Sequence, residues 1–350
     1  MHYPVIPITC KYLSMKRLIL SVLTLAALFS CGREGTGTQT PETPAPGALS
    51  ALAQANPEWT HENLRLVPVV ADQAFIGQNA AAAGYLTMEE AIKEYYFRIS
   101  EKMPFGRFAD HGSVLTAQNK LKQPVFLMSG DVVEGGRQDR VIAEDQVIAA
   151  NRIKDVPVFC VEHSRWSYNE PDEVVAAASE TQRRKIFAFS GYYHVAANDI
   201  RKTLQDNEGQ EAVWAKVDKF RAAHSVTTPT QAYTGLETAD DYTNKRDAYL
   251  DFFAGKFDGL ENAVGVMAIS GDRIMAVDVF GHPDLFRRQL PSLLHSYVTE
   301  AVTYGTEAKG NEKAIQLKMN EVNKGIAGDK SKGAKFENDG HLVHFSSLSN

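Results

Sequence analysis

Two short segments of the chain concentrate the side chains that could do chemistry. The first is Gly130–Arg140, in which acidic side chains, two glycines and two arginines follow a short apolar run. Glycine lets the backbone turn tightly or approach a ligand, and arginine can bind phosphate or carboxylate through two parallel hydrogen bonds. The alternative interpretation is a glycine turn between two strands with exposed charges. The segment lacks the Gly-Lys-Ser/Thr sequence of a phosphate-binding P-loop.

The second segment, residues 159–168, places a carboxylate, an imidazole, a guanidinium and an indole close together. Glu162 could act as a general base or pair with Arg140 or Arg165, and Trp166 could stack on a base or a sugar. The alternative is a structural ion pair covered by a packed tryptophan. Cys160 lies in an apolar run that predicts a buried strand, so we expect a structural cysteine rather than a catalytic thiol.

A third candidate is Asp278, an acid inside the apolar run Met275–Phe280. A buried carboxylate needs a partner, and we expect an arginine from one of the first two segments. His163, His194 and His282 do not have the spacing of metal ligands, so we expect no metal and no cofactor.

These residues define one site hypothesis. Glu162 and Asp131 are the candidate catalytic residues, and an anionic ligand is expected to contact Gln138, Arg140, Arg165, Trp166 and Asp278. The hypothesis predicts that folding gathers the acidic and guanidinium groups around one concave pocket.

The two segments also resemble a known family, the ADP-ribosylglycohydrolase- and rhodanese-phosphatase-superfamily-associated protein domain. The family pattern Cys-Val-Glu-x-x-Arg-Trp is matched in full by 160–166. In the pattern Gly-Glu-x-x-x-Gly-x-Lys-Gln-Asn-Arg, this chain has Asp131 for Glu, Arg137 for Lys and Asp139 for Asn. With Gln210–Trp214, Val264–Phe280 and Leu294–Tyr297, the resemblance covers residues 60–305. It implies an association with ADP-ribose and phosphate chemistry without assigning an activity.

The beginning of the chain predicts export. Lys16 and Arg17 precede an apolar run from Leu18 to Phe29, which is shorter than the roughly 20 residues that a membrane span needs. The following Ser30-Cys31-Gly32 resembles a bacterial lipoprotein signal, which implies acylation of Cys31 and cleavage before it. A single-pass anchor or an ordinary secretory signal is the alternative. Met15 is the expected start, so residues 1–14 lie upstream, and Gly32 after the cysteine favours the outer over the inner membrane.

The domain organisation follows from composition. Residues 1–30 form the signal peptide, and the Gly-, Thr- and Pro-rich residues 31–56 form a flexible tether with too little apolar surface to fold. Residues 57–310 are expected to form a single domain. Residues 311–350 form a polar extension, which we expect to be loose after 325 except for an edge strand at 342–345.

The domain itself is expected to be of the α+β class. A capping box at Thr87 and Glu90 predicts a helix. The hairpin Val264–Phe280 turns at Gly271-Asp272. Short strands that suggest an antiparallel sheet or sandwich are expected at 113–118, 124–128, 132–134, 140–142, 146–149 and 156–162, and helices at 210–223, 240–253, 283–288 and from Pro291 onward.

Composition limits the function. The net charge of -6 argues against a nucleic-acid partner, and 44% hydrophobic residues fit a globular body. We expect an envelope lipoprotein that acts as a binding or accessory module for an anionic ligand, anchored to the membrane through Cys31. The alternative is an enzyme that acts on a phosphate-bearing or ADP-ribose-like small molecule.

Overall fold

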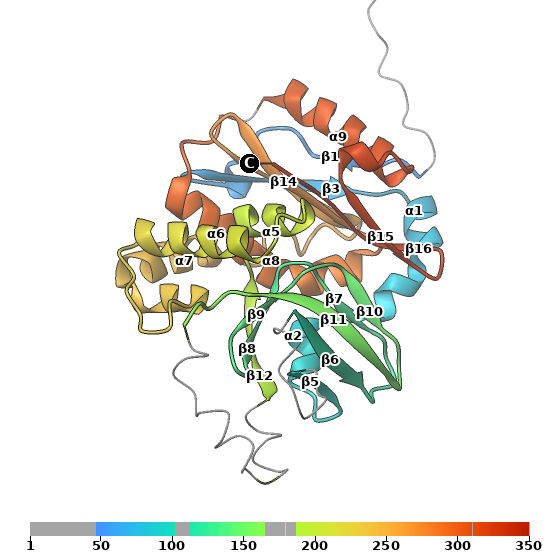
Figure 1. Ribbon diagram of the computed structural model, residues 1–350. Coiled ribbons are helices and arrows are strands. Elements are labelled where there is room, and N and C mark those ends of the chain that lie inside the picture. Colours follow the sequence, from blue (N-terminus) through green and yellow to red (C-terminus); the bar gives the residue numbers. More distant parts are fainter. Residues whose placement is uncertain (1–46, 102–112, 165–178, 180–186, 310, 350) are drawn as a thin grey trace, which may run out of the picture. The chain divides into compact units, whose positions relative to one another are not determined.

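The computed structural model describes residues 47–101, 113–164, 179, 187–309 and 311–349 (Figure 1). Residues Pro44–Asn350 form one compact unit. The expected signal peptide, Cys31, Arg165 and Trp166 lie outside the described residues.

A seven-stranded antiparallel sheet organises this unit. Its order is β1-β3-β13-β14-β16-β15, and β2 pairs with β3. The predicted hairpin is confirmed, because β13 and β14 are joined by Gly271-Asp272 and Gly271 has φ 63°. The strands are β1 (Ser50–Ala51), β2 (Thr60–His61), β3 (Leu64–Val70), β13 (Ala263–Ser270), β14 (Arg273–Phe280), β15 (Ala334–Asn338) and β16 (His341–Leu348).

Helices cover both faces of this sheet (Figure 1). Side chains alternate between the faces of a strand, so Val266 and Ala268 of β13 pack with α8 (Pro283–Tyr304), whereas Met267 and Ile269 pack with α9 (Glu312–Ile326). The short helix α1 (Gln73–Gln78) joins the α9 side through Phe75. A strand that is buried on both faces explains the continuous apolar sequence of β13.

Most strands of the predicted β-rich region, together with β12 after residue 168, form a closed six-stranded barrel and a small three-stranded sheet. The barrel order is β11-β6-β5-β12-β8-β9, and the small sheet is β10-β7-β4 with α2 (Met88–Ile92) beside it. The Thr87–Glu90 capping box is confirmed. The strands are β4 (Leu86–Thr87), β5 (Phe97–Glu101), β6 (Val114–Asn119), β7 (Val125–Leu127), β8 (Asp131–Gly135), β9 (Arg140–Ile142), β10 (Gln146–Ile148), β11 (Arg152–Cys160) and β12 (Ala188–Val195).

Helices α5 (Asn198–Gln205), α6 (Gln210–Ala223) and α7 (Asp240–Phe253) follow the barrel. Short 3-10 helices complete the unit: η1 (Pro57–Trp59), η2 (Ala80–Gly84), η4 (Tyr233–Thr238) and η5 (Lys330–Lys332). The α+β class, with a β-rich first half and a mainly helical second half, is therefore observed.

Four expectations about elements are wrong. The two helices expected at 283–288 and from Pro291 are one helix, because the apolar side chains on both sides of Pro291 keep packing on the sheet. The expected edge strand lies inside the sheet, since β16 pairs with both β14 and β15. Residues after 325 are not loose, and 311–349 belong to the same compact unit as the preceding domain. The range 31–56 also contains β1, which pairs with β3.

Candidate functional site

The Gly130–Arg140 segment folds as a tight connection between two barrel strands. Gly135 and Gly136, at φ 125° and 54°, turn the chain from β8 toward β9. A Cβ on Gly135 would lie 2.8 Å from the carbonyl oxygen of Ala188, so a larger residue cannot fit without moving β12. The glycines are therefore explained by the backbone turn.

Three of the predicted site residues meet in a buried polar cluster at the end of the barrel. Arg140 is 0% exposed. Its Nη1 donates to Gln138 Oε1 at 3.3 Å and also contacts the Cys160 sulfur, and its Nη2 lies 3.5 Å from Glu101 Oε1. Glu162 accepts from the Asp139 amide at 3.0 Å, and Gln138 Nε2 donates to the Glu162 carbonyl at 2.9 Å. Both Nη atoms of Arg140 are therefore used inside this cluster, whereas its Nε is buried without a hydrogen-bond partner in the described residues.

Cys160 is the one cysteine of the described residues, and it is buried as predicted. Burial raises the pKa of its thiol, although Arg140 acts in the opposite direction. A neutral thiol is a poor nucleophile. The side chain of Gln210 bonds both the amide and the carbonyl of Cys160, at 2.7 and 2.8 Å. The surroundings thus indicate a structural role.

Asp131 belongs to a different cluster. It is 0% exposed and accepts hydrogen bonds from the Met128 amide and the Tyr192 hydroxyl, both at 2.8 Å. The Tyr192 oxygen lies 2.6 Å from Ser292 Oγ, which also accepts from the Val195 amide at 3.1 Å. Burial, with a smaller contribution from the charge of Asp145 and without a cationic partner, raises the pKa of Asp131 to about 7.

Tyr192 and Ser292 line a polar cavity of about 340 Å³ between β12, α2 and α8. His194 and His295 line it too, with ring centroids 4.2 Å apart and nearly parallel planes. Burial lowers the pKa of both rings, that of His295 to about 4, so both imidazoles are neutral at pH 7. Since His194 Nδ1 contacts the Val195 carbonyl at 2.9 Å, Nδ1 carries the proton and Nε2 is an acceptor.

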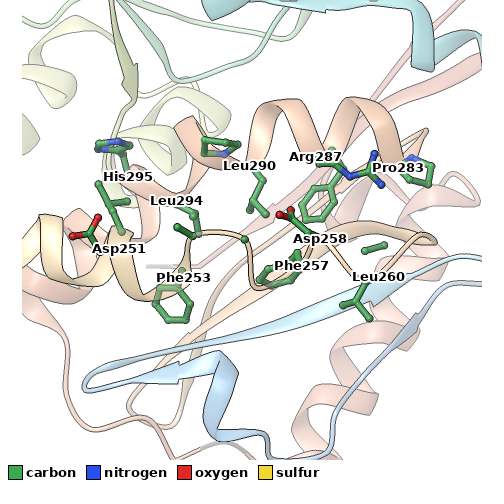
Figure 2. Close-up of a pocket in the computed structure, with 16 residues that line it drawn as sticks. Asp251, Phe253, Phe257, Asp258, Leu260, Pro283, Arg287, Leu290, Leu294 and His295 are labelled. Atoms are coloured by element: carbon green, nitrogen blue, oxygen red, sulfur yellow. The ribbon is translucent and has the colours of Figure 1, made fainter.

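A second, apolar cavity lies next to the first one. Pro291 and His295 line both cavities. Figure 2 shows Phe253, Phe257, Leu290 and Leu294 around it, with Asp251, Asp258, Arg287 and His295 as polar neighbours. Its volume is about 360 Å³.

Asp278 lies in a third cluster, at the centre of the large sheet. Arg201 holds both of its carboxylate oxygens, Tyr297 donates to it, and His344 Nε2 lies 3.1 Å away. Burial alone would raise the pKa of Asp278, but Arg201 and His344 together hold it far below its usual value. The expectation of an arginine from the first two segments is wrong, because Arg201 comes from α5, which packs against β16 and α8.

His344 extends this cluster toward a cavity. Its Nδ1 lies 2.7 Å from Asp145 Oδ2, and although burial opposes a charge on the ring, Asp145 and Asp278 raise its pKa to about 9. Asp145 and Arg201 line a cavity of about 750 Å³ between the barrel, α5 and the β15–β16 edge of the sheet. Its other lining includes Ser129, Lys335 and Ser346, with the apolar side chains of Phe159, Leu204 and Phe336.

The predicted convergence into one pocket is therefore wrong for the described residues. Gln138, Arg140 and Glu162 lie together, whereas Asp131 and Asp278 each belong to a separate cluster. The roles assigned to all of them remain predictions. Sequence reasoning missed Tyr192, Ser292, His295, Arg201 and His344. A usable signal existed in α8, where Ser292 and Ser296, one turn apart, belong to a row of buried polar residues that also contains Gln289, Thr299 and Glu300.

Within the described residues, no group of three or more His, Cys, Asp or Glu side chains could hold a metal ion. No helix of that part of the chain combines the length and the apolar character of a membrane span. A family model matches residues 53–343, and its description is "ARG and Rhodanese-Phosphatase-superfamily-associated Protein domain". The comparisons with curated proteins and with solved structures gave no match.

Proposed function

The chain belongs to the ARG and Rhodanese-Phosphatase-superfamily-associated Protein domain family, and we propose that it is a lipid-anchored envelope protein whose folded body binds an anionic small molecule. The anchor proposal rests on the residues that lead to Cys31, and the same residues favour the outer membrane. Because two or more acyl chains are needed for stable anchoring, a lipoprotein signal suits this purpose.

The observation that carries the ligand proposal is the cavity of about 750 Å³ beside Arg201. Ligand sites in proteins commonly measure about 300–1,000 Å³, so the cavity can hold a molecule the size of a nucleotide. Arg201 is 2% exposed, and its Nε is buried without a hydrogen-bond partner in the described residues. A buried N–H donor without an acceptor is costly, and an oxygen of a bound ligand would satisfy it.

The charges around the cavity fit an acceptor-rich ligand. Asp278 offsets the charge of Arg201, and His344 faces both Asp278 and Asp145. Lys335, which also pairs with Glu337 at 2.7 Å, adds a further charged donor to the lining. The aromatic rings of Phe159 and Phe336 supply apolar surface beside these donors. This combination suits a phosphate- or carboxylate-bearing molecule with an apolar or ring-shaped part.

The test is isothermal titration calorimetry and thermal unfolding of the purified chain with ADP-ribose, ADP, ribose 5-phosphate and inorganic phosphate. A ligand at 100 times its dissociation constant stabilises a protein by about 2.7 kcal/mol. Lys335→Gln should weaken binding about tenfold, because it removes a charged donor. Arg201→Lys keeps a cation opposite Asp278 but removes the Nε donor, so this variant should also bind the ligand more weakly.

Lys313→Gln, an exposed change on α9 outside the cavity, is the matched control and should leave binding unchanged. Absence of binding across the panel, or equal binding by Lys335→Gln and the unaltered protein, would contradict the proposal.

A further inference from the structure

A chain of hydrogen bonds connects a serine in a cavity with a carboxylate in the core. Asp131 accepts from the Tyr192 hydroxyl. The Tyr192 oxygen is then free to accept from the hydroxyl of Ser292, and the Val195 amide donates to the same serine oxygen. Each hydroxyl therefore has one donor role and one acceptor role, which fixes the direction of every proton in the chain.

Only the outer part of this chain lines a cavity. Ser292 and Tyr192 border the polar cavity of about 340 Å³, whereas Asp131 does not. A proton that leaves Ser292 can pass to the Tyr192 oxygen while the tyrosine proton passes to Asp131. The pKa of Asp131, raised by burial to about 7, suits a general base that works near neutral pH. The Val195 amide is placed to stabilise a negative charge on the serine oxygen.

Two of the residues that line the cavity also have a ring nitrogen without a partner among the described residues. His194 Nε2 and His295 Nδ1 are buried and make no hydrogen bond in the described part of the chain. Both rings are neutral, so they do not favour an anionic guest. Buried polar atoms of this kind are normally satisfied by water or a ligand. They supply the independent indication that the cavity accommodates a polar, uncharged molecule.

We propose that Ser292 is the nucleophile of an acyl-transfer site that takes small uncharged carboxylic esters, with Tyr192 and Asp131 as the residues that remove its proton. The Ser292 oxygen bonds to the carbonyl carbon, the bond from that carbon to the alkoxy oxygen breaks, and the leaving alcohol receives the proton held by Asp131 through Tyr192. Water then attacks the acyl-serine, loses a proton to the same chain, and Ser292 is reprotonated as the acid leaves.

The polar cavity limits the size of the substrate, because its volume of about 340 Å³ lies at the lower end of the range for ligand sites. The apolar cavity of Figure 2 lies beside it, since Pro291 and His295 line both. The site is separate from the cavity beside Arg201, with which it shares no lining residue. It therefore does not depend on the ligand proposed above.

Labelling with a fluorophosphonate probe tests the inference without knowledge of the natural substrate. Ser292 should attack the phosphorus, fluoride should leave, and mass spectrometry of the purified full chain should place the adduct on Ser292. Ser292→Ala should abolish labelling and the hydrolysis of p-nitrophenyl acetate. Ser296→Ala, a buried serine one turn further along the same helix, is the matched control and should retain both.

Tyr192→Phe and Asp131→Asn act through Ser292 and should lower the labelling rate at least a hundredfold, the usual contribution of general base catalysis. In the unaltered protein the rate should rise with pH through 7, and in Asp131→Asn this rise should disappear. The other titratable groups that line the cavity are Glu89, Lys93, Tyr193, His194 and His295, and Asp145 acts on Asp131 from outside it. All of them are unchanged in this variant. An adduct elsewhere, no adduct, or labelling that Tyr192→Phe leaves unaltered would overturn the inference.

Discussion

Asp131 and Asp278 are both completely buried carboxylates, yet their surroundings differ in one respect. Asp278 meets two cationic side chains, Arg201 and His344, and also accepts from Tyr297. Asp131 meets only neutral donors, which include a backbone amide and the hydroxyl of Tyr192. Burial penalises a charge in both places, so the partners decide which carboxylate stays ionised.

The outcome is opposite at the two sites. The pKa of Asp278 lies far below its usual value, and that of Asp131 is raised to about 7. Asp278 is therefore a fixed anion that ties β14 to α5 and β16, whereas Asp131 can gain or lose a proton near neutral pH. A buried acid that can exchange a proton is suited to chemistry, and one locked between cations is suited to holding elements together. Variants that remove either carboxylate or its partners test this contrast.

Arg201→Met should have the largest effect. It leaves Asp278 buried beside one cation instead of two, and the loss of one partner from a buried ion pair costs about 3–5 kcal/mol. Urea unfolding of the purified chain at pH 7, followed by circular dichroism, would measure the change in the free energy of unfolding. A loss below about 1 kcal/mol would mean that Arg201 does not hold the charge of Asp278.

The double variant Arg201→Met with Asp278→Leu is the control for this experiment. Replacing both members of a buried pair by apolar residues is often nearly neutral. The double variant should therefore recover much of the stability that Arg201→Met loses.

The second prediction concerns His344, which lies between Asp145 and Asp278. Its pKa is raised from 6.5 to about 9 in the folded protein. A raised pKa means that the folded protein binds the proton more tightly, so the stabilisation is complete below about pH 6.5 and is lost as the pH rises through about 9. The total loss should be on the order of 3 kcal/mol.

The measurement is the free energy of unfolding from pH 6 to pH 10. His344→Gln removes the titrating group and should flatten this part of the curve relative to the unaltered protein. If both proteins lose the same stability over that range, another group is responsible and the assignment to His344 fails.

Local signals in the sequence predicted the local structure well. The hairpin at Gly271-Asp272 and the capping box at Thr87 depend on neighbouring residues, so the sequence contains what is needed to recognise them. The same reasoning should have found the last hairpin. Asp339 and Gly340 both have positive φ and join β15 to β16, which is the Asp-Gly turn that favours a two-residue hairpin. The basic and small residues before this turn lack the alternating apolar pattern by which a strand such as β15 is recognised.

The candidate sites depend on contacts that no local pattern contains. The need of Asp278 for a partner was predictable from an acid in an apolar strand, but Arg201 lies 77 residues away on a helix that the sequence did not reveal. Asp131 and Gln138 are close in sequence, yet Asp131 begins β8 and Gln138 follows its other end. Residues of one sequence motif can therefore lie at opposite ends of a strand. The cluster that each of them joins depends on the residues that pack beside it in the fold, which the motif does not contain.

The smallest effect is expected for Asp131→Asn, and its sign separates the two carboxylates. The pKa of Asp131 rises from 3.8 to about 7 on folding, so its contribution to stability is present below about pH 4 and is lost as the pH rises through about 7. The unaltered protein should lose about 2–3 kcal/mol from this group between pH 5 and pH 8. Asparagine cannot ionise, so the variant should lack this loss and gain stability relative to the unaltered protein as the pH rises.

Asp278→Asn should behave in the opposite way and be destabilising at pH 8, because Arg201 and His344 lose their anion. Parallel unfolding curves of both variants at pH 5 and pH 8 measure the two signs directly. If Asp131→Asn is instead destabilised by a similar amount at pH 5 and at pH 8, as Asp278→Asn should be, Asp131 is held as an anion too, and the distinction between the two regions is wrong.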